Sequence, residues 1–388
     1  MHKMKIGLVL SRVPGASETF FASKIIGLQK AGHEVLLFAN GDLETKICEK
    51  ISHPTLSNNK FIMFILASCA LLKLVLFNPL VITRFLRSEI TDGKTLNQSL
   101  KNAYFNNHIL SSNLDWIHYG FITHAINREN LAYAIKAKMG VSLRGYDICI
   151  YPLKNPLCYS NIWRKIDKVH SISNDLIDAS VKMGFSKKKS FKIIKPAIDL
   201  KVFQKVNKNH KKVGEIKFLT IARLHWKKGL EDTIQALSII RDRDISFSYD
   251  IIGDGPELER LVFAAYDLGL DKNINFIGSV PHDNTISYYL RSDIYLQYSL
   301  QEGFCNATLE AQNMGLITLV SNAEGLEENV GNTNLVVKKR NPKLLADKII
   351  NVIENWSFYS KIVDNSRKRI KAENNIDHQI SQFLEFYD

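Results

Sequence analysis

Short apolar runs alternate with longer amphipathic stretches along most of this chain. In the first half, the runs have the length and composition of buried strands, and they lie at residues 5–10, 34–39, 115–119, 141–143, 168–172 and 191–195. Stretches with helical periodicity lie between several of them, at residues 18–31, 123–138 and 174–182. This alternation predicts a parallel sheet that is covered by helices on both faces.

The same alternation restarts after a lysine-rich stretch. Strands are predicted at residues 217–222, 248–253, 275–277, 293–297 and 316–320, with helices at 229–241 and 257–268. We therefore predict an α/β protein of two doubly wound, Rossmann-like domains facing a cleft, residues 1–200 and 201–388. The charged helical stretch after residue 355 is a candidate to cross back to the first domain. Ligands of such sheets bind beyond the carboxyl ends of the strands, so the loops there should carry the chemistry.

The charge of the chain changes this picture only in part. The formal net charge is +12, and residues 182–217 contain twelve lysines against Asp199 and Glu215. Such a stretch is typical of a solvated linker surface, and attraction to an anionic membrane surface is the alternative. No helix-turn-helix, zinc or aromatic-basic pattern accompanies it, so we do not expect nucleic acid as a partner.

The cysteines and one apolar run bear on the compartment. Five cysteines without a C-x-x-C pair are typical of reduced thiols, and the first residues lack the pattern of a cleavable signal, so we expect a cytoplasmic protein. The apolar run at residues 61–77 is interrupted only by Lys73 and is at the short limit for a bilayer span. We expect a buried helix there, and a helix lying in a membrane interface is the competing interpretation.

The most informative segment is SLQEGFCNATLEAQNMG, residues 299–315, which follows a predicted strand. Glu302 lies in the loop at the carboxyl end of the strand, and Glu310 lies one turn into a short helix. The amides of Phe304 and Cys305 can point at an anion. One carboxylate can accept hydrogen bonds from a sugar and the other from a ribose, with a diphosphate between them. Spacing alone, however, favours two exposed glutamates.

Two further loops follow predicted strands. RLHWKKG, residues 223–229, brings Arg223 and Lys228 to one strand end, where phosphate oxygens are natural partners, although a solvated basic turn is as good an interpretation. The loop GDGP, with Asp254, permits a tight turn but is not the six-residue dinucleotide fingerprint. No Asp-x-Asp pair of metal ligands follows a predicted strand.

Together these segments resemble a known family. RLHWKKG, IIGDGPELERL, INFIGSV and EGFCNATLEAQNMG, in this order over residues 223–330, resemble the C-terminal domain of family-four retaining glycosyltransferases with the GT-B fold. The first half matches more loosely. Its segments SRVPGASETF, HEVLLFA, LDWIHYGF, LRGYDICIYP, HSISNDLIDASVKMGF and IKPAID resemble the colanic-acid-type branch, which builds bacterial surface polysaccharides.

The resemblance implies roles on the donor side. Arg223 and Lys228 would bind the donor diphosphate in place of a metal ion, so no cofactor is required. Glu310 would hold the ribose hydroxyls, and Glu302 would contact the transferred sugar near the reacting centre. The other donor-binding positions implied are Asp254, Ile277, Phe304 and Cys305.

On the acceptor side the chain departs from the family pattern. Arg144 stands in LRGYD where many members carry a histidine. An arginine can bind a sugar hydroxyl or a phosphate but cannot act as a neutral base. His118, after a predicted strand, is a further catalytic candidate, and a structural histidine is the alternative.

We therefore predict a retaining glycosyltransferase of the hexosyltransferase type, with Glu302, Arg144 and His118 as its catalytic residues. It would move a sugar from a nucleotide-diphosphate donor to a saccharide or polyprenyl-linked acceptor in bacterial polysaccharide biosynthesis. It would work in the cytoplasm and, if its acceptor is lipid-linked, peripherally on the inner face of the plasma membrane. A nucleotide-sugar epimerase of the same fold and a non-catalytic basic membrane-surface partner protein are the alternatives.

Overall fold

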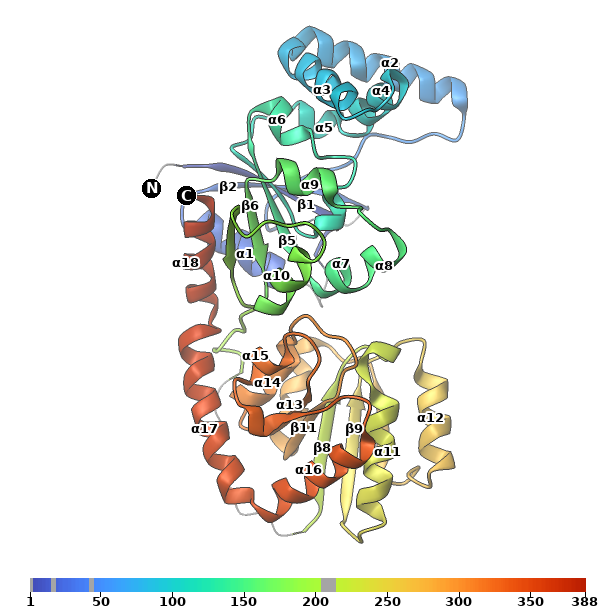
Figure 1. Cartoon of the computed structure of the whole chain (residues 1–388), viewed down its shortest axis with the longest axis vertical. Helices are drawn as coiled ribbons and strands as arrows, with labels where there is room; N and C mark the ends of the chain where they lie inside the picture. Colours follow the sequence, from blue (N-terminus) through green and yellow to red (C-terminus); the bar gives the residue numbers. More distant parts are fainter. Residues whose placement is uncertain (1–2, 15–18, 42–44, 204–213) are drawn as a thin grey trace. The chain divides into compact units, whose positions relative to one another are not determined.

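The computed structural model describes residues 3–14, 19–41, 45–203 and 214–388. The chain forms two compact units (Figure 1): unit 1 comprises Met1–Ile194 with Ile380–Asp388, and unit 2 comprises Lys195–Gln379. The division therefore falls between residues 194 and 195, where the sequence suggested 200 and 201, and the last residues of the chain belong to unit 1. Part of the lysine-rich stretch, residues 204–213, lies outside the described residues.

Unit 1 is built on a parallel seven-stranded sheet with the order β3-β2-β1-β4-β5-β6-β7. The central strands are buried along most of their length, which explains their continuous apolar runs. The strands are β1 (Lys5–Arg12), β2 (Glu34–Asn40), β3 (Glu49–Ile51), β4 (Trp116–Tyr119), β5 (Lys138–Leu143), β6 (Lys168–Ser171) and β7 (Ser190–Ile193).

Several helices of unit 1 follow one another between β3 and β4 with no strand between them, and the sequence pattern did not predict them as separate helices. The helices are α1 (Thr19–Lys30), α2 (Lys60–Phe77), α3 (Pro79–Thr91), α4 (Leu96–Phe105), α5 (Asn107–Leu110), α6 (Leu131–Ile135), α7 (Gly145–Cys149), α8 (Tyr151–Lys154), α9 (Ser160–Lys165) and α10 (Asn174–Val181).

The single helix predicted at residues 123–138 is wrong. A 3₁₀ turn, η2 (Ile122–Ala125), and the short helix α6 replace it, and β5 begins at Lys138. Asn127 and Lys136 have φ values of 62° and 63°, in the left-handed region that an α-helix cannot contain.

Unit 2 repeats the architecture with a parallel six-stranded sheet of order β10-β9-β8-β11-β12-β13. Its strands are β8 (Ile216–Ile221), β9 (Phe247–Ile252), β10 (Ile274–Gly278), β11 (Ile294–Gln297), β12 (Ile317–Ser321) and β13 (Val336–Val337). Its helices are α11 (Leu230–Arg241), α12 (Leu258–Asp267), α13 (Thr285–Arg291), α14 (Asn306–Asn313), α15 (Leu326–Val330), α16 (Pro342–Glu354) and α17 (Trp356–Glu373).

The last helix, α18 (Ile376–Tyr387), completes the core of unit 1. Phe383, Phe386 and Tyr387 are buried in the same cluster as Trp116 of β4. The indole Nε1 of Trp116 donates a hydrogen bond to the Tyr387 carbonyl oxygen at 3.0 Å. The end of the chain is therefore an integral part of the first sheet's packing.

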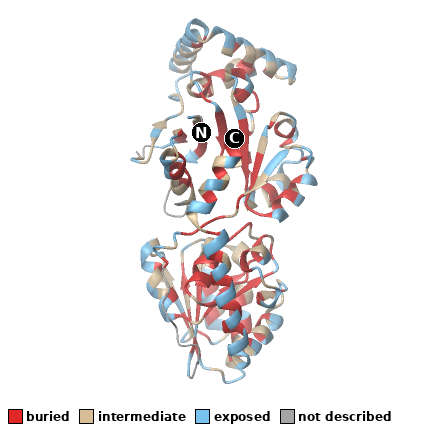
Figure 2. Ribbon diagram, turned by 90° about the vertical axis from the view of Figure 1, so that its left-hand side faces the viewer, coloured by how far each residue is buried: buried red, intermediate tan, exposed pale blue. Residues whose placement is uncertain are grey.

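The helix α2 contradicts the expectation of a buried helix at residues 61–77. Leu74 is its one buried residue, and Figure 2 shows the helices at the top of unit 1 largely in the colours of exposed and intermediate residues. In the described part of the chain it is also the one helix that is long and apolar enough to cross a membrane. Length and apolarity predicted the helix correctly but not its surroundings.

Replacing Phe386 by alanine should destabilise unit 1. The side chain is fully buried, and a phenylalanine-to-alanine change in a core costs about 3–5 kcal/mol. Urea unfolding followed by circular dichroism measures this change. Glu385→Ala is the matched control, because Glu385 is exposed on the same helix and should change the free energy of unfolding by about 1 kcal/mol or less. Equal effects of the two variants would contradict the packing described.

Candidate functional site

The order of strands in unit 2 reverses direction at one point. The chain runs from β8 outward to β9 and β10, then returns to β11 on the other side of β8. The loops after β8 and β11 therefore lie side by side, and the Leu300 amide donates to the Lys227 carbonyl oxygen at 2.7 Å. In open α/β sheets this reversal is where a ligand crevice is expected.

Lys228 and Glu302 meet at this point. Lys228 ends the 3₁₀ turn η3 (Trp226–Lys228) after β8, and its Nζ donates to the Glu302 carboxylate in the loop after β11. The two side chains are only 20% and 16% exposed. Burial by itself lowers the pKa of Lys228, but the Glu302 carboxylate outweighs it and the pKa is raised overall. The structure thus holds a charged, largely buried ion pair between two loops.

The helix α14 begins beside Glu302 with uncapped amides. Its N-cap residue, Cys305, makes no side-chain capping bond, so no cap side chain engages the first-turn amides. Asn329 fixes the start of the helix, because its Nδ2 donates to the Cys305 carbonyl oxygen at 2.8 Å. Phe304 and Cys305 are each 8% exposed. Their side chains therefore pack inward, and an anion would meet the backbone.

Glu310 is a buried carboxylate with two partners that sequence reasoning missed. His282 Nε2 lies 2.9 Å from Glu310 Oε1, and the Tyr289 hydroxyl donates to Glu310 Oε2 at 2.9 Å. The hydrogen bond to Glu310 raises the pKa of His282 above its usual value, although partial burial opposes the shift. A carboxylate can accept about four hydrogen bonds, so Glu310 can still bind further donors.

The remaining donor-side candidates lie on neighbouring loops of unit 2. Arg223 is exposed directly after β8, and Asp254 is exposed after β9, where its carboxylate accepts from the Gly255 amide at 2.7 Å. The Leu224 amide donates to the Asp254 carbonyl oxygen at 2.9 Å, which joins the two loops. Ile277, near the end of β10, is half-buried against an apolar cluster.

Close backbone contact holds the Glu302 loop in place. Gly325 has a φ of 75°, and a Cβ atom there would lie 1.9 Å from the Gly303 carbonyl oxygen. Only glycine permits this approach, which sets the position of the loop and of the start of α14.

Arg144 and His118 belong to unit 1. The Arg144 guanidinium carbon lies 4.0 Å from the ring centre of Phe20, and its Nε donates to the Gly120 carbonyl oxygen at 3.2 Å. Arg144 therefore lies just after the carboxyl end of β5, and its guanidinium group packs over the ring of Phe20 from α1.

His118 is fully buried inside unit 1. Its Nε2 lies 2.8 Å from the Ser142 hydroxyl, and its Nδ1 lies 2.8 Å from the Tyr387 hydroxyl. Burial lowers its pKa well below the usual value, so the ring is neutral. These contacts favour the structural alternative over a catalytic role, because a substrate cannot reach the ring in this arrangement.

Replacing Gly325 by alanine should destabilise unit 2 more than the backbone angle alone requires. A positive φ costs alanine about 1 kcal/mol, and the contact with Gly303 should add about 2 kcal/mol or more. Gly278→Ala is the matched control, because Gly278 has a φ of 79° with no atom within 4 Å of the added Cβ. Chemical unfolding of both variants measures the difference, and equal losses would contradict the close approach.

The contribution of His282 to stability should depend on pH. Its folded pKa is raised, so its stabilising effect is full below the unfolded value of about 6.5 and is lost as the pH rises through the folded pKa. His282→Gln keeps a donor but does not titrate. Urea unfolding should therefore show the wild type losing stability relative to this variant as the pH is raised above about 6.5. A difference in stability between the two proteins that does not change with pH would exclude a charged pair between His282 and Glu310.

Comparison with known proteins relates this geometry to a family. Residues 202–369 match the family described as Glycosyl transferases group 1. The capsular polysaccharide biosynthesis glycosyltransferase CapM of Staphylococcus aureus is 29% identical over 162 residues, which are 41% of this chain and 42% of CapM. The chain thus matches less than half of the length of this relative.

Solved structures extend the likeness over the whole chain. Sucrose-phosphate synthase from Thermosynechococcus elongatus matches with a TM-score of 0.74 at 16% identity, covering 99% of this chain and 98% of that one. HepE from Anabaena, in complex with UDP, matches with a TM-score of 0.73 at 16% identity and covers 98% of both chains. At this identity the likeness concerns the fold. The chain therefore has the GT-B fold of two parallel-sheet α/β units and carries, in residues 202–369, a glycosyl transferases group 1 domain.

Proposed function

We propose that this protein transfers a sugar from a nucleotide-diphosphate donor to an acceptor, and that unit 2 binds the donor. The observation that carries the proposal is the Lys228–Glu302 ion pair, which lies where the strand order reverses and beside the uncapped start of α14. A cation, a carboxylate and open amides in one place suit a ligand that carries both phosphates and hydroxyls.

The donor diphosphate would compete for Lys228. Phosphate oxygens arriving at Lys228 and at the exposed Arg223 would replace the carboxylate as partners of the ammonium group. Glu302 would then be released to accept hydrogen bonds from the hydroxyls of the sugar. In this proposal the ion pair keeps both groups charged and positioned until the donor arrives.

The nucleoside would lie on the other side of the diphosphate. Glu310, held by His282 and Tyr289, would accept hydrogen bonds from the ribose hydroxyls, and Ile277 would lie against the base. The amides of Phe304 and Cys305 would contact a phosphate or the sugar. Asp254 would line the same side.

We further propose retention of configuration without a required metal ion. Arg223 and Lys228 would stabilise the negative charge that develops on the departing diphosphate. A phosphate oxygen of the donor would take the proton of the attacking acceptor hydroxyl, so no side chain need act as the base. Arg144, in unit 1, remains a proposed contact of the acceptor.

The acceptor would be a saccharide or a polyprenyl-linked saccharide. Support comes from CapM, which is named for capsular polysaccharide biosynthesis. We propose a corresponding place for this protein in bacterial polysaccharide biosynthesis, in the cytoplasm and peripherally on an anionic membrane surface.

A panel of nucleotide sugars tests the proposed function. UDP-, GDP- and ADP-sugars are compared by thermal shift, and the stabilising donor is then incubated with and without acceptor saccharides. Stabilisation by one donor class, with product formed only when an acceptor is present, is the expected result. An epimerised donor formed without acceptor would replace the proposal by an epimerase. No stabilisation by any donor would leave the non-catalytic alternative.

Glu302→Ala should separate turnover from nucleotide affinity. If Glu302 contacts the transferred sugar, turnover should fall by about 10²- to 10³-fold. The affinity for UDP or GDP, measured by calorimetry, should change by less than about threefold or rise, since the nucleotide lacks the transferred sugar and loss of the carboxylate leaves Lys228 free for the diphosphate. Glu324→Ala is a matched control, because Glu324 pairs with Lys339 at 3.3 Å in a neighbouring loop and has no proposed contact with the donor. Equal losses of turnover and affinity in Glu302→Ala would contradict the proposal that Glu302 contacts the transferred sugar rather than the nucleotide.

A further inference from the structure

The helix α2 presents an unusually large apolar surface to its surroundings. Only 6% of its residues are buried. The exposed large side chains of α2 are Phe61, Ile62, Phe64, Ile65, Leu72, Val75, Leu76 and Phe77, and Leu80 continues the surface into α3. A contiguous apolar surface of this kind marks a site of interaction.

One narrow stripe of α2 faces the protein. Met63, Leu66, Ala67, Ala70 and Leu71 are half-buried, and with the buried Leu74 they recur at spacings of three and four residues. The helix contacts α3, α4 and α5, and Figure 1 shows it lying across this group. The rest of its circumference is exposed. A lipid phase can cover such a surface from several directions at once, whereas a folded partner covers one face.

The charges around α2 favour an anionic surface. Residues 51–88 contain Lys60, Lys73, Arg84 and Arg87 and no aspartate or glutamate. Leu72 lies opposite the stripe that faces the protein and so marks the middle of the exposed face. Lys73 is the next residue and therefore lies about 100° around the helix from it. At that border its long side chain can reach a headgroup while its stem stays among apolar chains.

Both ends of α2 are held to the same part of unit 1. On the N-terminal side, the Tyr104 hydroxyl of α4 donates to the Thr55 carbonyl oxygen at 2.5 Å, and Tyr104 is 3% exposed. On the C-terminal side, Asn78 alone separates α2 from α3. The α3–α4 pair therefore anchors the chain on both sides of the helix.

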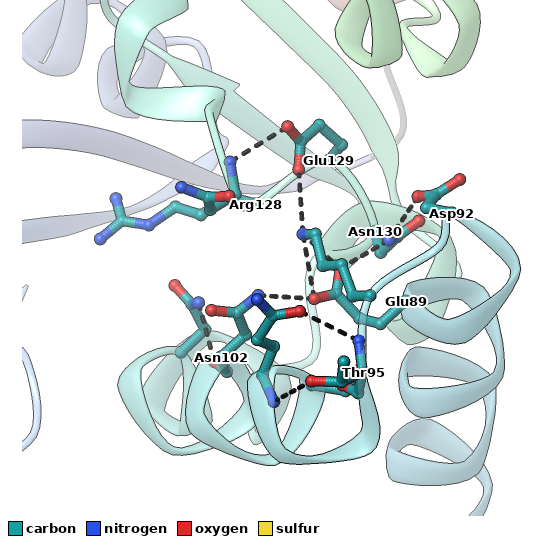
Figure 3. A network of polar contacts seen from close by, with 12 residues as sticks. Glu89, Asp92, Thr95, Asn102, Arg128, Glu129 and Asn130 are labelled. Carbon is teal, nitrogen blue, oxygen red and sulfur yellow. Dashed lines mark hydrogen bonds and ion pairs between the residues drawn. The ribbon is translucent and has the colours of Figure 1, made fainter.

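A buried polar network fixes this anchor to the rest of unit 1 (Figure 3). Glu89 of α3 is fully buried and accepts hydrogen bonds from Asn102 of α4 and from Asn130, both at 2.6 Å. Lys94 pairs with Glu89 at 3.0 Å and lies 3.8 Å from Glu129. Removing Lys94 would leave the buried charge of Glu89 without a cation, and the two asparagines connect the same carboxylate to α4 and to the segment before α6, so α3 and α4 are firmly attached.

From these observations we propose that α2 lies in the plane of an anionic phospholipid bilayer, within one leaflet, and does not span it. The inference rests on the proposed membrane association and specifies its mode. The exposed face around Leu72 enters the acyl region, and Lys60, Lys73 and Arg87 meet the headgroups.

The anchors exclude a spanning helix. A span would place Lys60 on the far side of a hydrocarbon core about 30 Å thick. Thr55, held by Tyr104, is five residues away, a distance of about 17 Å at most in an extended chain. The polar segment between them would then have to cross the hydrocarbon with unpaired backbone groups, which a bilayer does not tolerate.

Flotation with vesicles tests the membrane contact. The full chain should float with vesicles of phosphatidylcholine and phosphatidylglycerol, and Phe64→Glu should reduce the bound fraction at least about tenfold. Phe263→Glu on α12 is the matched control, because Phe64 is 70% and Phe263 is 67% exposed, and it should float like the wild type. Failure of the wild type to float, or equal flotation of Phe64→Glu, would overturn the proposal.

A labelling experiment tests the single-leaflet arrangement. In a background with both Cys69→Ser and Cys149→Ser, Asn58→Cys carries a thiol just before α2, and Lys154→Cys carries one on α8 as a control. A membrane-impermeant maleimide should label both from outside sealed vesicles and neither from inside. Labelling of position 58 only from inside would show a span. Burial raises the pKa of the Cys48 thiol to about 11 and also raises the pKa values of Cys158 and Cys305, so these native thiols should react slowly.

The outcome is independent of the donor chemistry. Phe64→Glu lies outside unit 2 and should keep the thermal shift with nucleotide sugars. Loss of flotation with donor binding intact supports the proposal. A wild type that floats in a single leaflet but binds no donor would leave the membrane inference standing and remove the proposed transfer.

Discussion

Direct backbone contact between loops is the constraint on which the site in unit 2 depends. Gly253 and Gly325 allow their loops to approach the carbonyl oxygens of Ala222 and Gly303, where a Cβ atom would in each case lie 1.9 Å away. Gly229, which follows Lys228, approaches the Tyr298 carbonyl oxygen just after β11 in the same way, and a Cβ atom there would lie 2.1 Å from it. That contact sets how far apart the loops after β8 and β11 stand, and hence that a lysine from one loop reaches a glutamate from the other. The chemistry of the site therefore depends first on three positions, Gly229, Gly253 and Gly325, that carry no side chain.

Buried charges in both units connect segments that are distant in the chain. Lys228 and Glu302 join two loops, His282 and Tyr289 hold Glu310, and Glu89 joins α3, α4 and the segment before α6. Since an unpaired buried charge is strongly unfavourable, each group stabilises the position of the others. The pairs in unit 2 differ from the Glu89 network in one respect. They lie at the carboxyl ends of strands or beside them, where an incoming ligand can exchange for one partner.

The sequence predicted what depends on local pattern and missed what depends on distant contacts. Apolar runs bounded by polar turns located most strands to within a few residues, and the loops after β8 and β11 were recognised from their residue types. The partners of Glu310 could not be found in this way, because His282 is 28 and Tyr289 is 21 positions away. The surroundings of His118 depend on Tyr387, 269 positions later. The exposure of α2 was missed for the same reason, since an apolar helix has one pattern whether protein or lipid covers it.

The assignment of α18 to both units has a consequence for biosynthesis. Unit 2 is continuous in the chain, whereas unit 1 needs Ile380–Asp388 to fill its core. At about 5–20 residues per second, the ribosome finishes those residues roughly 10–40 s after Ile194. During that interval the first sheet is translated but lacks Phe386 and Tyr387, so its apolar surface is open to chaperones or to other nascent chains. Unit 1 is therefore translated first but can finish folding only after unit 2 has been made.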